Sequence, residues 1–194
     1  MNSENMHSGN LFIVSAPSGA GKSTLCRALL DTFADIQYSV SYTTRRPRAK
    51  EENGVHYHFI DKQVFEKGIS TGRWAEWAEV HGNYYGSDGD FINKCLAAGD
   101  DILHDIDVQG TRQILERYPE SITIFILPPS LDALAQRLEL RDTDSQESIA
   151  LRLKNAEKEI AQKDLYRHEI VNDRLPEAVA RLTAIVKRYR SGQR

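Results

Sequence analysis

The feature that most constrains this chain is a glycine-rich segment between an apolar run and a helix-like run. Residues 16–23 read Ala-Pro-Ser-Gly-Ala-Gly-Lys-Ser; the apolar run Leu11–Val14 precedes them and Thr24–Leu30 follows. Strand, tight glycine turn and helix opening with Lys-Ser are the layout of a P-loop, whose backbone N–H groups and helix N-terminus bind phosphates. The sequence therefore predicts a nucleoside triphosphate site. An ordinary glycine–serine turn is the alternative, which the flanking strand and helix disfavour.

The positions of this loop have different expected tasks. Lys22 contributes a point charge to the phosphates, and Ser23 is placed to ligate a Mg²⁺ ion that the phosphates hold. Ala16 stands where the usual pattern has its first glycine, which is tolerable only if the turn needs no positive φ there. The expected triphosphate contacts are Ala16, Pro17, Ser18, Gly19, Ala20, Gly21, Lys22, Ser23 and Thr24.

Composition narrows the class of protein. The chain has 194 residues, a net charge of −3 and two cysteines, which predicts one globular domain without a disulfide framework. The overall basicity typical of nucleic-acid binding is missing, so we expect no such partner. Residues 1–10 are polar and predict a disordered tail, and no apolar run approaches a membrane span. A cytoplasmic protein without a membrane partner is the expectation.

Apolar runs that read as strands alternate with helical patterns. Such an alternation predicts an α/β fold of three layers, with a central parallel sheet covered by helices on both faces, as in P-loop NTPases. The last helix is expected to start near Pro176, because proline is favoured in a first turn. The expected strands are 11–15, 38–42, 102–106, 122–127 and roughly 168–171, and the expected helices include 109–117, about 131–138 and 149–160.

Two segments break this rhythm. Residues 43–87 are rich in Arg, Tyr, Trp and Gly, with a turn at Gly82–Asn83, and they predict a small β-rich insertion. Residues 139–148 are highly polar and lie between two helices, as a mobile lid would.

The insertion carries a candidate second phosphate site. Arg45 and Arg48 flank a proline that enforces an extended or turned backbone. The planar fork of arginine matches a phosphate bidentately, and the hydroxyls of Tyr57 and Tyr85 are candidate neutral donors. A solvated basic loop is the alternative, which the neighbouring P-loop disfavours.

Glu76 is a candidate reader of a guanine base. It alternates with aromatic residues, as in a half-buried strand. A carboxylate accepts two hydrogen bonds side by side, and guanine offers the adjacent donors N1–H and N2–H₂, whereas adenine presents an acceptor at N1. Asp107 is a candidate partner for the exocyclic amine, and Ser41 and Ser87 are candidate donors to O6. The alternative is a solvent-facing charge, which is the expectation for Glu79.

Further charged residues fit phosphoryl transfer. The run 102–107 is an apolar strand that ends in acids, of which Asp105 is the better candidate to orient Mg²⁺ directly or through water. Asp107 is alternatively a cap of the following helix. Arg137, Arg141 and Arg152 frame the predicted lid and are candidates to stabilise the transferring phosphoryl group. Exposed arginines on amphipathic helices are the alternative.

Several motifs together carry a family resemblance. They are Ser15–Ser23, Ser41–Arg48, Gly82–Ser87, Asp105–Gly110, Ile126–Ser130 and Val171–Asp173. With them the chain resembles guanylate kinases from about Leu11 to the C-terminal helix. The resemblance implies transfer of the ATP γ-phosphoryl group to GMP, with Mg²⁺, as an ATP:GMP phosphotransferase of purine nucleotide metabolism. It also implies a CORE (about 11–40, 94–136 and 153–194), a GMP-binding subdomain (about 41–93) and a LID (about 137–152).

Residue roles follow from the resemblance by position. It implies guanine readers at Ser41, Glu76, Ser87 and Asp107, and a GMP-phosphate clamp at Arg45, Arg48, Tyr57 and Tyr85. It implies catalytic roles for Lys22, Arg45, Arg137, Arg141 and Arg152, and an adenine approach at Asn172. Leu140 and Asp142 stand where the family usually has glycines, which bears on the hinge of the lid.

Two other readings stay open at this point. A guanylate-kinase-like binding module would share the fold, but such modules generally lack the intact Gly21-Lys22-Ser23 sequence. A sugar-phosphate kinase would keep the P-loop and have no use for a guanine reader such as Glu76. The sequence leaves open whether the chain is a monomer or a homo-oligomer, and whether dGMP is accepted.

Overall fold

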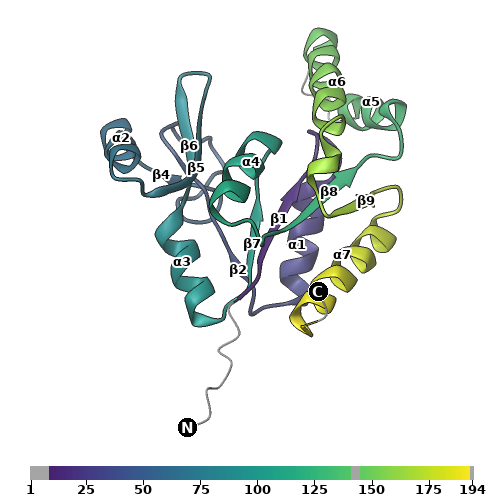
Figure 1. Cartoon of the computed structure of the whole chain (residues 1–194). Coiled ribbons are helices and arrows are strands. Elements are labelled where there is room, and N and C mark those ends of the chain that lie inside the picture. The colour runs from purple at the N-terminus through teal and green to yellow at the C-terminus, as the bar shows by residue number, and fades with distance from the viewer. Residues whose placement is uncertain (1–8, 141–144, 193–194) are drawn as a thin grey trace. The chain divides into compact units, whose positions relative to one another are not determined.

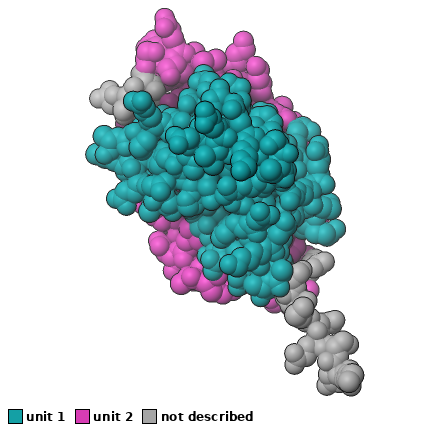
Figure 2. Space-filling view, turned by 90° about the vertical axis from the view of Figure 1, so that its left-hand side faces the viewer, with its two compact units in different colours: residues 1–11, 36–104, 109–121 teal, residues 12–35, 105–108, 122–194 magenta. Residues whose placement is uncertain are grey.

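The structure, a computed structural model, describes residues 9–140 and 145–192 (Figure 1). By its internal contacts the chain divides into two compact units, which Figure 2 distinguishes by colour. Unit 1 takes its residues from 1–11, 36–104 and 109–121, and unit 2 from 12–35, 105–108 and 122–194. Arg141 and Asp142, and the predicted tail apart from its last two residues, lie outside the described residues.

A five-stranded parallel sheet with helices around it forms the α/β framework that the sequence predicted. Its strand order is β2-β7-β1-β8-β9. Near-continuous apolar runs suit parallel strands that are covered on both faces, and every residue of β1 is buried. The bounds are β1 Leu11–Ser15, β2 Gln37–Tyr38, β7 Ile102–Asp105, β8 Ile122–Leu127 and β9 His168–Val171.

Two helices of unit 2 begin at a serine that caps them. Ser130 and Ser145 each accept a hydrogen bond from a backbone N–H three residues on, at the starts of α5 and α6. Pro176 lies in the first turn of α7, as expected. Ala156 of α6 packs with Leu134 and Leu138 of α5 in one apolar cluster. The bounds are α1 Lys22–Thr32, α5 Leu131–Glu139, α6 Gln146–Ile160, the 3₁₀ helix η1 Lys163–Leu165 and α7 Leu175–Arg190.

Unit 1 contains the insertion, which is a four-stranded sheet of order β4-β3-β6-β5 with helices beside it. The sheet is mixed, because β3 and β4 are parallel whereas β6 is antiparallel to both β3 and β5. Helix α2 was not predicted. The bounds are β3 Tyr42–Thr43, β4 His58–Phe59, α2 Lys62–Ser70, β5 Trp74–Val80, β6 Asn83–Asp88, α3 Gly89–Ala98 and α4 Val108–Arg117.

The prediction of one strand over residues 38–42 was wrong. The first part pairs with β7 as β2, and Ser39 N–H still donates to the Leu103 carbonyl at 3.0 Å. Tyr42 then pairs with His58 and Gly86 as part of β3, in the other sheet. One apolar run thus serves two sheets, and periodicity alone does not show where the chain leaves the first.

The hairpin of β5 and β6 also departs from simple alternation. Its register shifts between Trp74 and Glu76, a bulge that places both of these side chains in the interior, whereas Trp77 is exposed. The turn lies at His81 and Gly82, with φ of 51° and 76°, so both central residues are left-handed as in type I′ hairpins. The predicted turn was one residue late, because Asn83 already belongs to β6.

The described helices include none that is both long enough and apolar enough to cross a bilayer.

Candidate active site

The backbone of residues 16–23 has the conformation of a phosphate-binding loop. Gly19 and Gly21 have φ of 93° and 94°, a region that glycine enters without steric cost, and Gly21 caps the N-terminus of α1. Among the described residues His81 is the only non-glycine with positive φ. Ala16 therefore occupies ordinary backbone space, which confirms the condition under which its methyl group is tolerated.

Asn172 supports this loop from the end of β9. Its side chain is 6% exposed, and its Nδ2 donates to the Ala20 carbonyl at 2.8 Å. A Cβ at Gly21 would lie 2.4 Å from the same Nδ2, so glycine is required there by close approach as well as by conformation. The family resemblance predicts that Asn172 approaches adenine, and that contact stays a prediction.

Lys22 and Asp105 meet at the phosphate-binding loop. Their Nζ and Oδ2 atoms lie 3.2 Å apart, and the side chains are 24% and 18% exposed. Asp105 ends β7, as its place after an apolar run predicted, and Ser23 is exposed at the start of α1. One lysine, one carboxylate and one hydroxyl thus belong to unit 2, at or beside the phosphate loop.

Glu159 is a further carboxylate whose pKa is affected by the charge of Lys22. Burial, and secondarily the charge of Asp107, raise the pKa of Glu159 to about 6, while Lys22 acts in the opposite direction. Asp107 is exposed and directly precedes α4. Sequence reasoning did not single out Glu159, because it lies more than fifty residues along the chain from Asp107, the acid that affects its pKa.

The predicted lid arginines have different positions. Arg137 of α5 is partly buried, and its Nη2 donates to the backbone carbonyl of Asn172 at 2.8 Å. Arg152 of α6 is also partly buried, and Arg141 lies outside the described residues. Arg137 therefore braces the segment that itself supports the phosphate loop.

In unit 1 the structure brings together Arg45, Tyr57 and Tyr85, three members of the predicted phosphate clamp. The Arg45 guanidinium lies 5.5 Å from the Tyr57 ring centroid, and the Tyr57 and Tyr85 rings are 5.9 Å apart. Hydrogen bonds that Arg45 donates to Glu51 and Tyr85 outweigh partial burial and raise the pKa of Arg45 above its usual value. The fourth member, Arg48, is exposed.

Glu51 is the residue of this cluster that sequence reasoning missed. Its two oxygens accept from Arg45 Nη1 at 2.8 Å and Nη2 at 2.9 Å, and Oε2 also accepts from the Arg48 backbone N–H at 2.7 Å. These bonds, led by that of Arg45, lower the pKa of Glu51 to about 2. The only sequence signal was an acid a few residues beyond the paired arginines.

The predicted guanine readers Glu76 and Ser87 face each other across β5 and β6. They are register partners, and Ser87 Oγ donates to Glu76 Oε1 at 2.6 Å. Glu76 is 8% exposed and Ser87 is fully buried, whereas Glu79 is exposed as expected. The third reader of this unit, Ser41, is partly buried and adjoins β3.

Gln113 of α4 holds the strand beside Glu76. Its Oε1 accepts from the Trp77 N–H at 3.1 Å, and its Nε2 donates to the Trp77 carbonyl at 3.0 Å. Because β5 is an edge strand, the amide takes the place of a neighbouring strand at this position. No sequence pattern identified this contact.

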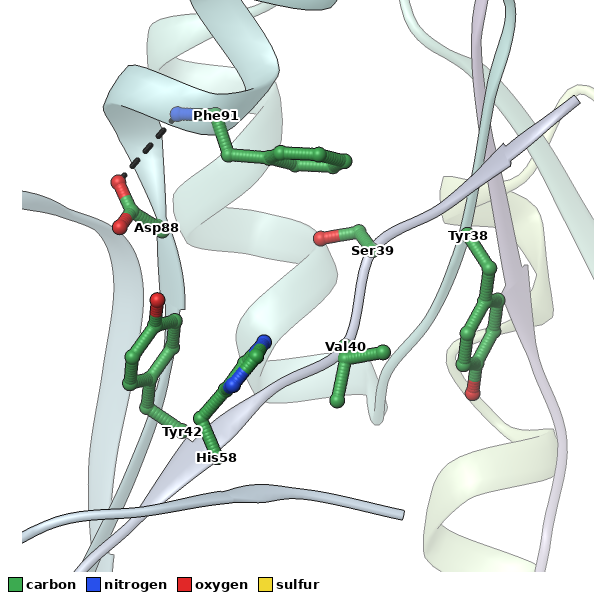
Figure 3. A pocket seen from close by; sticks show the side chains of 7 residues that line it. All are labelled: Tyr38, Ser39, Val40, Tyr42, His58, Asp88 and Phe91. Carbon is green, nitrogen blue, oxygen red and sulfur yellow. Dashed lines mark hydrogen bonds between the residues drawn. The ribbon is translucent and has the colours of Figure 1, made fainter. Parts of the chain in front are cut away.

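Two pockets lie within unit 1. Figure 3 shows the smaller, about 70 Å³, in which the rings of Tyr42 and His58 stack at 4.4 Å beside Asp88. That volume suits about two waters and not a nucleotide. The larger, about 420 Å³, is within the range of ligand sites and includes Arg45, Arg46 and Phe59 in its lining.

Fold and loop define the class of protein. P-loop nucleotide-binding proteins have a parallel sheet in an α/β fold and a glycine-rich phosphate loop that ends in a lysine. This chain has both, and Asp105 lies beside the lysine. The family model described as guanylate kinase matches residues 8–189, and the chain belongs to that family.

Individual relatives agree with this assignment. The guanylate kinase of Carboxydothermus hydrogenoformans is 46% identical over 181 residues, covering 93% of this chain and 89% of its own. That of Neisseria meningitidis is 49% identical over 182 residues, covering 94% and 89%. A crystal structure of guanylate kinase from Anaplasma phagocytophilum superposes with a TM-score of 0.75 at 32% identity, covering 93% of this chain and 86% of that one.

Proposed function

We infer that this protein is an ATP:GMP phosphotransferase, which converts ATP and GMP to ADP and GDP. The observation that carries the inference is the intact phosphate loop, with Lys22 beside Asp105, in a chain of the guanylate kinase family. A binding module has no need of this lysine. The presence of the loop therefore favours an enzyme.

The ATP half of the reaction is assigned to unit 2. The loop N–H groups and the N-terminus of α1 bind the phosphates, and Lys22 neutralises charge that develops during transfer. Arg137, Arg141 and Arg152 are proposed to approach the transferring group. No general base is required, because phosphoryl transfer depends mainly on positioning and charge stabilisation.

The GMP half is assigned mainly to unit 1. Arg45, Arg48, Tyr57 and Tyr85 are proposed to bind the phosphate of GMP. The pair of Glu76 and Ser87, with Ser41 and Asp107, is proposed to bind guanine. The Glu76–Ser87 hydrogen bond supports this, since it orients the Glu76 carboxylate while leaving it lone pairs that accept from guanine. A carboxylate there favours the guanine N1–H and N2–H₂ donors and disfavours the N1 acceptor of adenine.

Mg²⁺ fits the residues of unit 2. Magnesium prefers oxygen ligands, commonly one or two carboxylates together with substrate phosphates and water. The Ser23 hydroxyl and the Asp105 carboxylate are the proposed protein groups, with Asp105 acting directly or through water. Such an ion supplies positive charge to the phosphates, and Lys22 supplies the same from the protein side.

The acceptance of dGMP, the division into subdomains and the location are proposed as well. The contacts proposed for GMP address its base and its phosphate, so we expect dGMP to be accepted too. The division into CORE, GMP-binding subdomain and LID, and the cytoplasmic location, rest on the sequence and the family resemblance.

Product analysis tests the proposed function. The purified protein is incubated with ATP and Mg²⁺ and, in separate reactions, with GMP, AMP, CMP or UMP, and the nucleotides are separated by anion exchange. We expect GDP and ADP in equal amounts from GMP, and at least about 100-fold lower rates with the other acceptors. Release of phosphate without GDP, or equal rates for all four acceptors, would contradict the proposal.

A further inference from the structure

The strand that carries Glu76 has a bulge and lies at the edge of its sheet. Its register with β6 shifts between Trp74 and Glu76, which makes Ala75 the extra residue of the bulge. Because side chains alternate along a strand, a slip of one residue would turn Glu76 away from Ser87. A carboxylate that reads a base from this strand therefore needs a contact that holds the register.

Helix α4 contacts the outer edge of β5 on both sides of Glu76 in the sequence. Gln113 binds Trp77 through two hydrogen bonds, one from the Trp77 N–H at 3.1 Å and one to the Trp77 carbonyl at 3.0 Å. One helical turn later, Arg117 Nη1 donates to the Trp74 carbonyl at the longer distance of 3.4 Å. Gln113 thus makes the shorter and more numerous contacts of the two.

The hydrogen bonds of Gln113 determine which residues of β5 face outward. In an antiparallel pair, residues whose N–H and C=O face the partner strand alternate with residues whose groups face away. Trp77 is of the second kind, since both of its backbone groups bind Gln113. A slip of one residue would turn these groups towards β6 and lose both bonds.

This register is the one that orients the carboxylate of Glu76. Glu76 directly precedes Trp77, is paired with Ser87, and accepts a hydrogen bond from the Ser87 hydroxyl at 2.6 Å. The Trp77 side chain restrains the strand less, because it is 37% exposed and meets the Tyr84 ring edge-on at 5.8 Å. The amide of Gln113 therefore contributes a restraint on backbone that side-chain packing at this position does not replace.

We propose that Gln113 is a positioning residue for base selection: by holding both backbone groups of Trp77, it fixes the register in which Glu76 presents its carboxylate to guanine. This inference deepens the proposed function and rests on it. The competing possibility is that Gln113 only stabilises unit 1. In that case its removal would lower the melting temperature and leave the preference for GMP over AMP unchanged.

Gln113→Met is the variant that isolates these hydrogen bonds. Methionine is unbranched, is similar to glutamine in length and is a good helix former, but it neither donates nor accepts as an amide does. Glu116→Met is the matched control, since it introduces the same side chain at an exposed position of α4.

The functional test is a double-mutant cycle on the full chain, with kcat/KM measured for GMP and for AMP at saturating ATP. We expect Gln113→Met to lower the ratio of kcat/KM for GMP over AMP by about tenfold, mainly through a higher KM for GMP. In a Glu76→Ala background the same substitution should change this ratio by less than about twofold. Glu116→Met should match the unaltered protein, and thermal melting verifies that each variant is folded.

Hydrogen exchange followed by NMR tests the structural step separately from activity. The Trp77 amide is bound by Gln113, so it should exchange at least about tenfold faster in Gln113→Met than in the unaltered protein or in Glu116→Met. Unchanged exchange at Trp77 would show that the amide does not hold the strand, and would overturn the inference.

The kinetic results can overturn it in two further ways. An unchanged ratio of GMP over AMP in Gln113→Met would show a merely structural role. A change of the ratio that persists in the Glu76→Ala background would show that Gln113 acts elsewhere. If the unaltered protein does not phosphorylate GMP, the proposed function itself fails and this inference fails with it, whereas failure of the inference alone leaves that activity intact.

Discussion

We propose that the phosphate loop of unit 2 and the Arg45 cluster of unit 1 each bind a phosphate, but the two sites are built differently. The loop depends on backbone: two glycines with φ above 90° and the N-terminus of α1. The Arg45 cluster depends on side chains, because Glu51, Tyr57 and Tyr85 hold one guanidinium. A backbone site is thus encoded in consecutive residues, whereas a side-chain site is assembled from separate segments.

This difference predicts how each region responds to substitution. The loop tolerates a changed side chain wherever the backbone conformation permits, as Ala16 illustrates. The side-chain clusters have no such freedom, since each partner fixes another: Ser87 bonds Glu76, and Glu51 bonds Arg45. Substitutions that alter backbone conformation should therefore disrupt the phosphate loop, and substitutions that remove one side chain should disrupt the side-chain clusters.

The largest expected effect is that of Lys22→Ala. Removal of the lysine charge from the phosphates should lower kcat by about 10³-fold, because charge stabilisation of the transferring group is the main catalytic term. The protein should stay folded, since the Lys22 side chain is partly exposed. A coupled assay with ATP and GMP measures kcat, with Lys187→Ala on α7, which is also exposed, as the control. A kcat within tenfold of the unaltered protein would remove Lys22 from the mechanism.

Next in size is the effect of Glu76→Ala on base selection. Loss of the carboxylate should leave the donors of guanine without an acceptor and reduce the ratio of kcat/KM for GMP over AMP by about 100-fold. Glu79→Ala, an exposed position of the same strand, provides the control. An unchanged preference for GMP would reject Glu76 as the guanine reader.

Alanine substitution at two glycines, one in the phosphate loop and one outside it, tests how far the loop depends on its backbone conformation. Gly21→Ala should lower the free energy of unfolding by about 3 kcal/mol, since it combines a left-handed φ with a contact to Asn172. Gly72→Ala, where φ is 69° but nothing lies within 4 Å, should cost only about 1 kcal/mol. Urea unfolding measures both, and equal losses would show that the Asn172 contact adds nothing.

The smallest expected effect concerns Glu159 and pH. Its folded pKa, about 6, exceeds the usual 4.5, so its contribution to stability is present below about pH 4.5 and is lost as the pH rises through 6. Glu159→Gln stays neutral and should be more stable than the unaltered protein by about 1 kcal/mol at pH 8, after allowance for solvent screening, and by nearly nothing at pH 4. Urea unfolding at both pH values, with the exposed Glu157→Gln as control, measures this. An equal gain at both pH values would contradict the assignment.

Much of the framework was predictable because its signals are local. The apolar run Leu11–Ser15 and the helix start at Lys22 gave strand, loop and helix in register with the structure. The strands Ile122–Leu127 and His168–Val171 were predicted with the bounds that the structure has. Each of these elements is specified by neighbours in sequence, which pattern reasoning reads directly.

The misses have a common physical cause, which is dependence on distant residues. The bulge between Trp74 and Glu76 depends on how β5 pairs with β6. The predicted strand over residues 38–42 divides in two because its ends pair with strands of different sheets. Gln113 and Glu51 matter through contacts that no periodicity encodes. The assignment of GMP contacts came from the family resemblance, and the pairing of Glu76 with Ser87 needed the structure.

One crossed binding experiment tests the central claim that unit 2 recognises the triphosphate and unit 1 the guanine nucleotide. Calorimetry gives the Kd for GMP and for a non-hydrolysable ATP analogue in Lys22→Ala and in Glu76→Ala. We predict that Lys22→Ala binds GMP as the unaltered protein does and the ATP analogue poorly, and that Glu76→Ala binds the ATP analogue normally and GMP poorly. Loss of both ligands in either folded variant would contradict it.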